Sequence, residues 1–339
     1  MSLTSNQIQF SKEELDGETN RLFASLSNLG WTKEICQTYA PLTLEINSLK
    51  KQKNAIILAH NYQLPEIIFG VSDFVGDSYQ LSKQAAQTSA QTIIFSGVRF
   101  MAETAKMLSP KKNVLMPSPD AGCSLAESIN AQDVINLRKQ HPDAAVVTYI
   151  NTYAEVKAES DVICTSNNAL KIIESLPNEK IIFLPDKYMA QNLAKLTKKQ
   201  IIGWEGLCVV HEEFSPQKLE AYRRFYPEAK ILVHTECSPA VVAIADLAGG
   251  TGEMQKYVSN SSANEFMIVT ECGLSDKLKV EFPKKKFIPS CGLCPHMKRN
   301  DLRNILKALK NPSPDQFVEV PLDVASRAQK ALDKMLEFA

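Results

Sequence analysis

The chain has 339 residues, a formal net charge of zero at pH 7 and 44% hydrophobic residues. This apolar content supports large buried cores, and the balanced charge excludes an electrostatic case for binding nucleic acid. The longest apolar runs have strand length and are broken by charges or proline, so we expect no membrane span. Residues 1–7 lack the basic and apolar parts of a signal peptide, and eight cysteines in so long a chain do not resemble a secreted disulfide scaffold. We therefore expect a cytoplasmic protein that uses cysteines for metal binding or catalysis.

Taken in order, the chain begins with a polar stretch, residues 1–50, which we predict to be a helical arm. Within it, Ser11 and Glu14 match a capping box at the start of a first helix. From about residue 51, apolar runs alternate with helical patterns, and this alternation is typical of parallel sheets with right-handed crossovers. Because the runs lack polar alternation, they suit strands that are buried on both faces.

The predicted strands are Ala55–Ala59, Thr92–Ser96, Asn113–Met116, Ala145–Ile150, Val162–Thr165, Ile181–Leu184, Gln200–Gly203, Ile231–His234 and Phe266–Thr270. The predicted helices are Ser78–Ala90, Arg99–Leu108, Asn167–Leu176, Asp186–Leu196, Pro239–Leu247 and Val324–Phe338.

Three cysteines recur at a nearly constant spacing. Cys208 follows Cys123 by 85 residues (208 minus 123), and Cys294 follows Cys208 by 86 (294 minus 208). Other positions keep almost the same period: polar strand ends at His60, Tyr149 and His234, turn hydroxyls at Ser78, Ser166 and Thr251, and strands starting near Thr92, Lys180 and Glu265. Such a period indicates one structural unit copied three times. We therefore predict three pseudo-symmetric, Rossmann-like three-layer αβα domains around a central active site, at 51–141, 142–228 and 229–339, the last with a C-terminal helix.

Functional side chains of parallel α/β sheets gather beyond the carboxyl ends of the strands. The polar residues expected there, or at the next helix start, are His60, Tyr62, Ser78, Tyr149, Asn151, Ser166, His234, Glu236 and Thr251. Three-fold packing would bring these edges together, and one cysteine of each unit would converge on the same point. Three thiolates suit zinc or an iron–sulfur cluster. A structural zinc site normally takes four protein ligands, often from local cysteine pairs, and only Cys291 and Cys294 form such a pair. The wide spacing of Cys123, Cys208 and Cys294 therefore favours a 4Fe–4S cluster. With three cysteine ligands, one iron of the cluster would stay open and act as a Lewis acid.

Eight segments carry a more specific likeness: Ala59-His-Asn-Tyr-Gln63, Gly76-Asp-Ser78, Ala121-Gly-Cys123-Ser, Tyr149-Ile-Asn151, Thr165-Ser166, Trp204-Glu-Gly-Leu-Cys208, His234-Thr-Glu-Cys-Ser238 and Cys294-Pro-His-Met-Lys298. Together they resemble the quinolinate synthase family, the A-type iron–sulfur enzymes of NAD biosynthesis. The resemblance implies three α/β domains around a cluster. It also implies a transferase that condenses iminosuccinate (iminoaspartate) with dihydroxyacetone phosphate to quinolinate, releasing phosphate and two waters. An L-aspartate oxidase or dehydrogenase is the implied supplier of iminosuccinate.

The resemblance also implies roles for individual residues. The expected cluster ligands are Cys123, Cys208 and Cys294, and the expected iminosuccinate-binding residues are His60, Ser78, Tyr149, Asn151, Ser166, His234, Glu236 and Thr251. Tyr62, His211 and Glu236 are expected to be catalytic. Glu236 is the candidate general base, because a tight site can raise the pKa of a carboxylate into a useful range.

The chain departs from the family pattern at two positions. Cys291 is left from a longer cysteine run of some members, and it is either a spare thiol or the partner of Cys294 in a disulfide. Gly250 stands where some relatives have serine, which puts one side-chain contact in doubt. The other residues of interest receive structural interpretations: Cys36, Cys164, Cys237 and Cys272 as core residues, His141 and His296 as packing residues, and Glu271 without a role.

Three other functions remain open on the sequence. The first is an enzyme of the diphthamide-synthesis type, which also gathers three cysteines from three domains and uses S-adenosylmethionine on a protein substrate. The polar pairs His60/Tyr62 and His234/Glu236 favour a small acidic substrate instead. The second is an iron–sulfur sensor or scaffold without catalysis, and the third is a zinc hydrolase.

Overall fold

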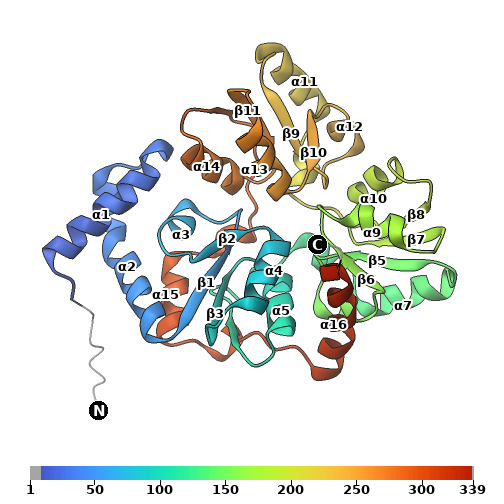
Figure 1. The fold of residues 1–339 in the computed structure, drawn as a ribbon, viewed down its shortest axis with the longest axis horizontal. Coiled ribbons are helices and arrows are strands. Elements are labelled where there is room, and N and C mark those ends of the chain that lie inside the picture. The colour runs from blue at the N-terminus through green and yellow to red at the C-terminus, as the bar shows by residue number, and fades with distance from the viewer. Residues whose placement is uncertain (1–8, 338–339) are drawn as a thin grey trace.

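Three parallel, four-stranded sheets form the framework of the protein, and each lies in a lobe of its own (Figure 1). The computed structural model describes residues 9–337. Each sheet places its strands in the same order, β2-β1-β3-β4, β6-β5-β7-β8 and β10-β9-β11-β12. The strands are β1 (Ala55–His60), β2 (Phe74–Gly76), β3 (Thr92–Ser96), β4 (Asn113–Leu115), β5 (Ala145–Tyr149), β6 (Val162–Cys164), β7 (Lys180–Leu184), β8 (Gln200–Gly203), β9 (Lys230–His234), β10 (Leu247–Gly249), β11 (Glu265–Val269) and β12 (Lys286–Ile288).

Helices cover both faces of the sheets, and neighbouring residues of one strand therefore lie in different cores. In β1, Ile57 and Leu58 are both fully buried, although consecutive side chains of a strand point to opposite faces. Ile57 packs in a cluster with Ile46 and Ile305, and Leu58 packs in another with Leu81. The predicted α/β fold of three Rossmann-like, three-layer αβα domains is confirmed. Burial on both faces explains why these apolar runs lack polar alternation.

One helix lies between each two consecutive strands of a sheet, and further helices connect one sheet to the next. They are α3 (Pro65–Ile68), α4 (Ser78–Gln87), α5 (Arg99–Leu108), α6 (Ser124–Glu127), α7 (Ala131–Gln140), α8 (Ala154–Ala158), α9 (Ala169–Ser175), α10 (Lys187–Ala194), α11 (Pro216–Phe225), α12 (Pro239–Val242), α13 (Thr251–Asn260) and α14 (Cys272–Glu281). The 3-10 turns are η1 (Ser27–Leu29), η2 (His211–Glu213), η3 (Met297–Arg299) and η4 (Pro314–Gln316). Within residues 9–337, no helix combines the length and apolarity that crossing a lipid bilayer requires.

One predicted helix is wrong over half its length. The pattern predicted Pro239–Leu247, but α12 ends at Val242. Leu247 begins the edge strand β10, where it pairs with Leu232. An apolar run without polar alternation suits both a buried helix and a strand, so this sequence did not separate them.

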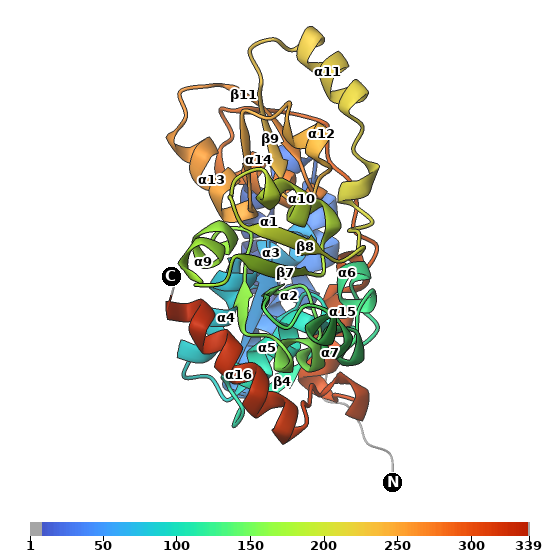
Figure 2. The same cartoon turned by 90° about the vertical axis from the view of Figure 1, so that its right-hand side faces the viewer.

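The N-terminal helices pack on the first sheet, and the C-terminal helices pack on the first and second sheets. The N-terminal helices are α1 (Lys12–Leu26), which begins with the predicted capping box at Ser11, and α2 (Lys33–Gln52). Of the C-terminal helices, α15 (Leu302–Lys310) packs on α2 and β3, and α16 (Leu322–Glu337) packs on α8, β6 and α5 (Figure 2). Residues 302–337 thus return to the first and second sheets, and the predicted unit boundaries stay predictions. Residues 1–7, used for the signal-peptide expectation, and Phe338 lie outside the described residues.

Two cysteines form a disulfide that was not predicted. A parallel bridge between Glu271 and Gly292 brings Cys272 and Cys291 together with their Cα atoms 4.9 Å apart, and their sulfur atoms are bonded. The interpretation of Cys272 as an ordinary core residue is therefore wrong. A disulfide between Cys291 and Cys294 is also excluded here, because Cys294 is a free thiol.

Candidate active site

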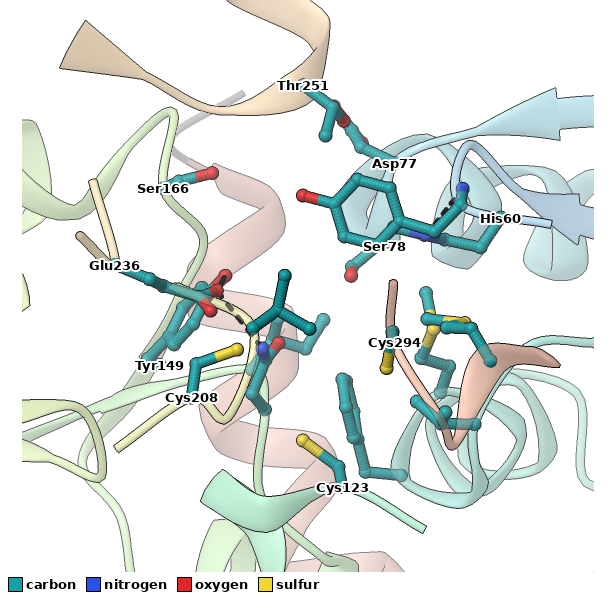
Figure 3. Close-up of a pocket in the computed structure, with 18 of the residues that line it drawn as sticks. His60, Asp77, Ser78, Cys123, Tyr149, Ser166, Cys208, Glu236, Thr251 and Cys294 are labelled. Atoms are coloured by element: carbon teal, nitrogen blue, oxygen red, sulfur yellow. Dashed lines mark hydrogen bonds between the residues drawn. The ribbon is translucent and has the colours of Figure 1, made fainter. Parts of the chain in front are cut away.

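The three sheets present their carboxyl edges to one central pocket (Figure 3). The structure brings all predicted site residues to this pocket: His60, Tyr62, Ser78, Cys123, Tyr149, Asn151, Ser166, Cys208, His211, His234, Glu236, Thr251 and Cys294. The reason is topological, because equivalent strands of three similar sheets end at the same place. His60, Tyr149 and His234 are the last residues of β1, β5 and β9.

The histidines at two of these strand ends have the same local geometry. The Nδ1 atom of His60 accepts the backbone N–H of Tyr62 at 3.2 Å, and the Nδ1 atom of His234 accepts the N–H of Glu236 at 3.3 Å. Burial lowers the pKa of His60 to about 3 and that of His234 to about 4. Both rings are therefore neutral at neutral pH, and each keeps its proton on Nε2. Such an N–H can donate a hydrogen bond to a carboxylate or carbonyl ligand.

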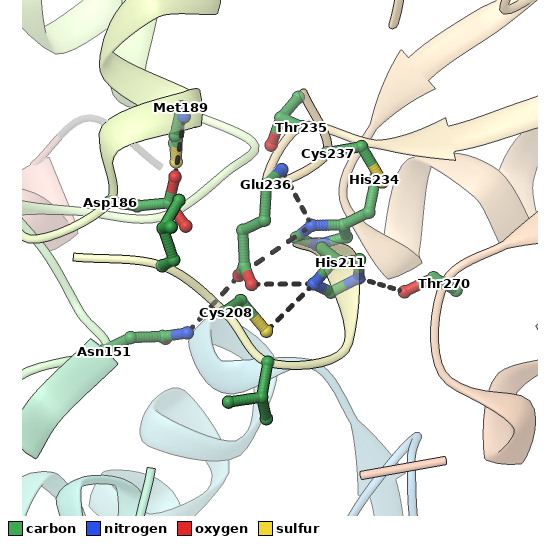
Figure 4. Close-up of polar contacts among 12 residues, drawn as sticks. Asn151, Asp186, Met189, Cys208, His211, His234, Thr235, Glu236, Cys237 and Thr270 are labelled. Carbon is green, nitrogen blue, oxygen red and sulfur yellow. Dashed lines mark hydrogen bonds and ion pairs between the residues drawn. The ribbon is translucent and has the colours of Figure 1, made fainter. Parts of the chain in front are cut away.

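Glu236 is the centre of a buried hydrogen-bond network (Figure 4). Its Oε1 accepts the hydroxyl of Tyr149 at 2.6 Å and the amide of Asn151 at 3.4 Å, and its Oε2 lies 2.9 Å from Nδ1 of His211. Burial by itself raises the pKa of Glu236. The imidazoles of His234 and His211 and the donated hydrogen bonds outweigh burial and hold that pKa below its ordinary value. The expected rise in the pKa of Glu236 is therefore wrong, and the carboxylate is ionised.

Two tyrosines contact this network and keep their protons. Burial, followed by the charge of Glu236, raises the pKa of both Tyr62 and Tyr149 well above the ordinary value. The ring of Tyr62 also packs edge-on against His60, with centroids 4.5 Å apart. The pocket therefore holds two neutral phenols, two neutral imidazoles and one buried carboxylate, a set suited to binding a polar anion and to moving protons.

The three repeated cysteines approach the pocket from three loops, each after the last strand of its sheet. Cys123 precedes α6, and Cys208 and Cys294 each stand three residues before a 3-10 turn. Figure 3 shows their sulfur atoms directed toward a common space. All three are free thiols, and burial raises their pKa values, that of Cys123 to about 12. A metal centre would displace these protons, because thiolates are the metal ligands.

The thiol spacing can be compared with the geometry that a single zinc ion requires. Zinc–thiolate bonds of about 2.3 Å would place tetrahedral sulfur ligands roughly 3.8 Å apart. Among residues 9–337, the only group of metal-binding donors with all atoms within 4.8 Å is Cys208, His211 and Glu236, so the three thiols do not form such a set. His296 also lines the pocket, and its buried Nδ1 has no hydrogen-bond partner among the described residues. Three separated thiols beside an unpartnered imidazole fit an iron–sulfur cluster.

Hydroxyl groups at the starts of helices form the opposite wall of the pocket (Figure 3). Ser78 and Thr251 are the first residues of α4 and α13, and Ser166 lies three residues before α9. The amide of Asn167 donates to Asp77 at 3.2 Å and links the first two lobes. Gly250 fits closely against the second lobe, since a Cβ atom there would lie 2.3 Å from Oγ of Ser166.

Sequence reasoning missed several residues near the site. Asp77 and Asn167 line the pocket beside predicted residues, and their polar character next to helix starts was the available signal. Thr270 follows β11 at the carboxyl edge, where polar residues were expected, and its hydroxyl contacts Tyr62 and His211. His296, interpreted as a packing residue, also lines the pocket, and its role stays a prediction. Glu271, given no role, is fully buried, pairs with Lys298 and accepts the N–H of Cys294.

Known proteins share extensive sequence similarity with this chain. The family model of the quinolinate synthetase A protein matches residues 44–337. A quinolinate synthase of Xylella fastidiosa (strain Temecula1) is 49% identical over 291 residues, which cover 86% of this chain and 85% of that protein. Quinolinate synthase 2 of Mesorhizobium japonicum is 49% identical over 86% of this chain and 89% of its own, and the enzyme of Sinorhizobium fredii is 45% identical over 88% and 83%. The chain belongs to the quinolinate synthetase A family.

Proposed function

We propose that this protein is a quinolinate synthase of NAD biosynthesis, a transferase that condenses iminosuccinate with dihydroxyacetone phosphate. The reaction forms quinolinate and releases phosphate and two waters. A separate L-aspartate oxidase or dehydrogenase would supply the iminosuccinate. The observation that carries the proposal is the convergence of one thiol from each lobe on a pocket lined by His60, His234 and Glu236.

Cys123, Cys208 and Cys294 would hold a 4Fe–4S cluster. When bound, the cluster supplies a Lewis-acidic iron with an open position, which polarises a substrate oxygen or nitrogen and assists loss of water. The chemistry of the donors supports this assignment, because a 4Fe–4S cluster takes cysteine thiolates and three such ligands leave one iron free.

The protein's own residues would bind the dicarboxylate and control protons. The Nε2–H groups of His60 and His234 would donate to carboxylate oxygens, as would the hydroxyls of Ser78, Ser166 and Thr251. Neutral imidazoles suit this task, because they donate without fixing a charge in the pocket. Tyr149 and Asn151 would orient the ligand next to Glu236.

Proton transfer is assigned to Tyr62, His211 and Glu236. Glu236 is ionised and hydrogen-bonded to Tyr149 and His211, so it can accept a proton directly or through either neighbour. Its lowered pKa makes it a weaker base than a carboxylate with a raised pKa would be, which gives its neighbours a larger share of the task.

The test is anaerobic reconstitution with iron and sulfide, followed by an assay with iminosuccinate and dihydroxyacetone phosphate. We expect about four iron and four sulfide per chain and the formation of quinolinate. A full cluster without quinolinate would refute the proposed reaction and favour the sensor reading. Replacing Cys123, Cys208 or Cys294 singly with serine should reduce the iron content, whereas Cys36→Ser, at a buried position of α2, should not.

A zinc enzyme is the second candidate, and one observation favours it. Cys208, His211 and Glu236 place three donor atoms within 4.8 Å. However, the contacts of His211 Nδ1 with Cys208 Sγ at 3.1 Å and Glu236 Oε2 at 2.9 Å are already hydrogen-bonding distances. Metal analysis after purification in the presence of both metals decides between them, and stoichiometric zinc without iron would support the zinc enzyme.

A further inference from the structure

A buried amide lies directly behind one of the pocket hydroxyls. Asn61 follows His60, the last residue of β1, and it is fully buried and does not line the pocket. Its Nδ2 atom lies 3.0 Å from Oγ1 of Thr251, the first residue of α13. Asn61 therefore reaches a bound ligand only through the hydroxyl of Thr251.

A buried lysine fixes the orientation of this amide. Nζ of Lys277, in α14, donates to Oδ1 of Asn61 at 2.8 Å. The same ammonium group donates to Oε1 of Gln255 at 3.2 Å, and Oε1 of Glu281 lies 3.7 Å away. Because an ammonium group has donors and no acceptor, a flipped amide would set its NH2 group against the lysine. The oxygen of Asn61 therefore faces Lys277, and its NH2 group faces the third lobe's pocket wall.

The hydrogen-bond direction at Thr251 follows from this orientation. An amide NH2 group only donates, so the hydroxyl of Thr251 accepts from Asn61. Among residues 9–337 the hydroxyl makes no other hydrogen bond, and its single proton is left for a ligand. Thr251 lines the pocket, so this proton faces the space where a ligand would bind (Figure 3). A carboxylate oxygen only accepts, and it is therefore a suitable partner.

The three residues come from two lobes. Asn61 belongs to the first sheet, where its backbone N–H donates to the carbonyl of Gly76 in β2. Lys277 and Thr251 lie on two neighbouring helices in the chain of the third lobe. Docking of the first lobe against the third thus sets the direction of the Thr251 donor.

We propose that Asn61 is a positioning residue, oriented by Lys277, that makes the Thr251 hydroxyl a hydrogen-bond donor to a carboxylate of the bound ligand. This inference rests on the proposed function, in which Thr251 binds the dicarboxylate. Asn61→Asp is the most direct test, because it keeps the side-chain shape and the acceptor for Lys277. A carboxylate cannot donate, so the Thr251 hydroxyl would donate to the substituted side chain instead of to the ligand.

The measurements are the Kd of quinolinate by calorimetry and the KM for iminosuccinate, both on reconstituted protein of known iron content. Asn61→Asp should raise Kd and KM by roughly 10- to 100-fold, as expected for the loss of a hydrogen bond to a charged group. The kcat should change by less than about threefold, because binding and not proton transfer is affected. The melting temperature should not fall, since Lys277 gains a charged partner. A wild-type Kd for Asn61→Asp would overturn the proposal.

A second variant and a matched control separate positioning from stability. Lys277→Met frees the amide of Asn61 to turn and should raise the Kd of quinolinate by roughly 10-fold. Lys50→Met removes another buried lysine, one that pairs with Asp73 and donates to the carbonyl of Val71 far from the pocket. It should lower the melting temperature and leave the Kd unchanged. An equal rise of the Kd in both variants would contradict a specific role of Lys277.

A double-mutant cycle tests whether Asn61 acts through Thr251. Asn61→Asp should raise the Kd of quinolinate by a smaller factor in a Thr251→Val background than in the wild type, because the hydroxyl that it orients is gone. Equal factors would overturn the proposal. A wild type that forms no quinolinate would refute the proposed function instead, whereas the binding assay needs no turnover and still tests the role of Asn61.

Discussion

Gly250 offers a direct test of how closely the lobes must fit around the pocket. Its backbone has φ −82° and ψ 176°, which any residue adopts, so alanine would strain only the packing. A Cβ atom would lie 2.3 Å from Oγ of Ser166 and 2.6 Å from Oδ1 of Asn167. Ordinary contact begins near 3.4 Å, so these atoms must move by about 1 Å. The movement would displace the Ser166 hydroxyl from the pocket and weaken the bond from Asn167 to Asp77.

We therefore expect Gly250→Ala to lower kcat/KM by roughly 10- to 100-fold, mostly through KM. The magnitude follows from losing one hydrogen bond to a charged ligand, about 1.5–3 kcal/mol, and 1.4 kcal/mol corresponds to about tenfold. Steady-state quinolinate formation is the assay. Gly17→Ala is the matched control, because a Cβ there meets nothing within 4 Å and alanine favours the helix. Wild-type kinetics for Gly250→Ala would show that the close fit against Ser166 has no role in binding.

Three further predictions follow from buried groups. Alkylation of the denatured, unreduced protein should label six of the eight cysteines, because Cys272 is bonded to Cys291, and labelling of all eight would contradict the disulfide. Burial lowers the pKa of Lys157 from its ordinary value of 10.5 to about 7. Between these two pH values the unfolded chain holds a proton on Lys157 that the folded chain has lost. The destabilisation caused by burying Lys157 therefore fades as pH rises from 7 to 10.5. Lys157→Met should therefore raise the free energy of unfolding by about 1–4 kcal/mol at pH 6, with a gain that shrinks toward pH 10.5 in urea unfolding; a constant gain would refute the reasoning. Glu236→Gln removes the charge that accepts the Tyr149 hydroxyl and should lower kcat by about 10²-fold or more at unchanged iron content, and a normal rate would remove Glu236 from the proton transfers.

The fold was largely predictable, because strands that are buried on both faces appear in the sequence as continuous apolar runs. Thr92–Ser96, which is buried at four of its five residues, matches β3 residue for residue. The edge strands β2, β10 and β12 were missed, whereas the equally short edge strands β4 and β6 were predicted. Three residues are too few to show a period, so periodicity does not separate such strands from loops. The destination of the C-terminal helices was also not predictable, because an amphipathic pattern shows that a helix has a partner and not which one.

The site residues were predictable by type and position, but their ionisation was not. Functional polar residues of parallel sheets gather at the carboxyl ends of the strands, so the predicted strand ends indicate where these residues meet. The pKa of Glu236, however, depends on Tyr149 and His211, which lie 87 (236 minus 149) and 25 (236 minus 211) residues away. The disulfide likewise depends on the pairing of Glu271 with Gly292, and neither cysteine spacing nor composition reveals that pairing.

The return of the C-terminal segment to the first sheet has a consequence for biosynthesis. Val318 donates to Val114, and Gln316 accepts from Met116, so residues made late complete the edge at β4. Phe317 follows Leu115, its bridge partner, by 202 residues (317 minus 115). At about 5–20 residues per second, a ribosome needs roughly 10–40 s to cover that distance. During this interval the β4 edge of the nascent first sheet lacks its later partner, and an unpaired strand edge favours pairing with other chains.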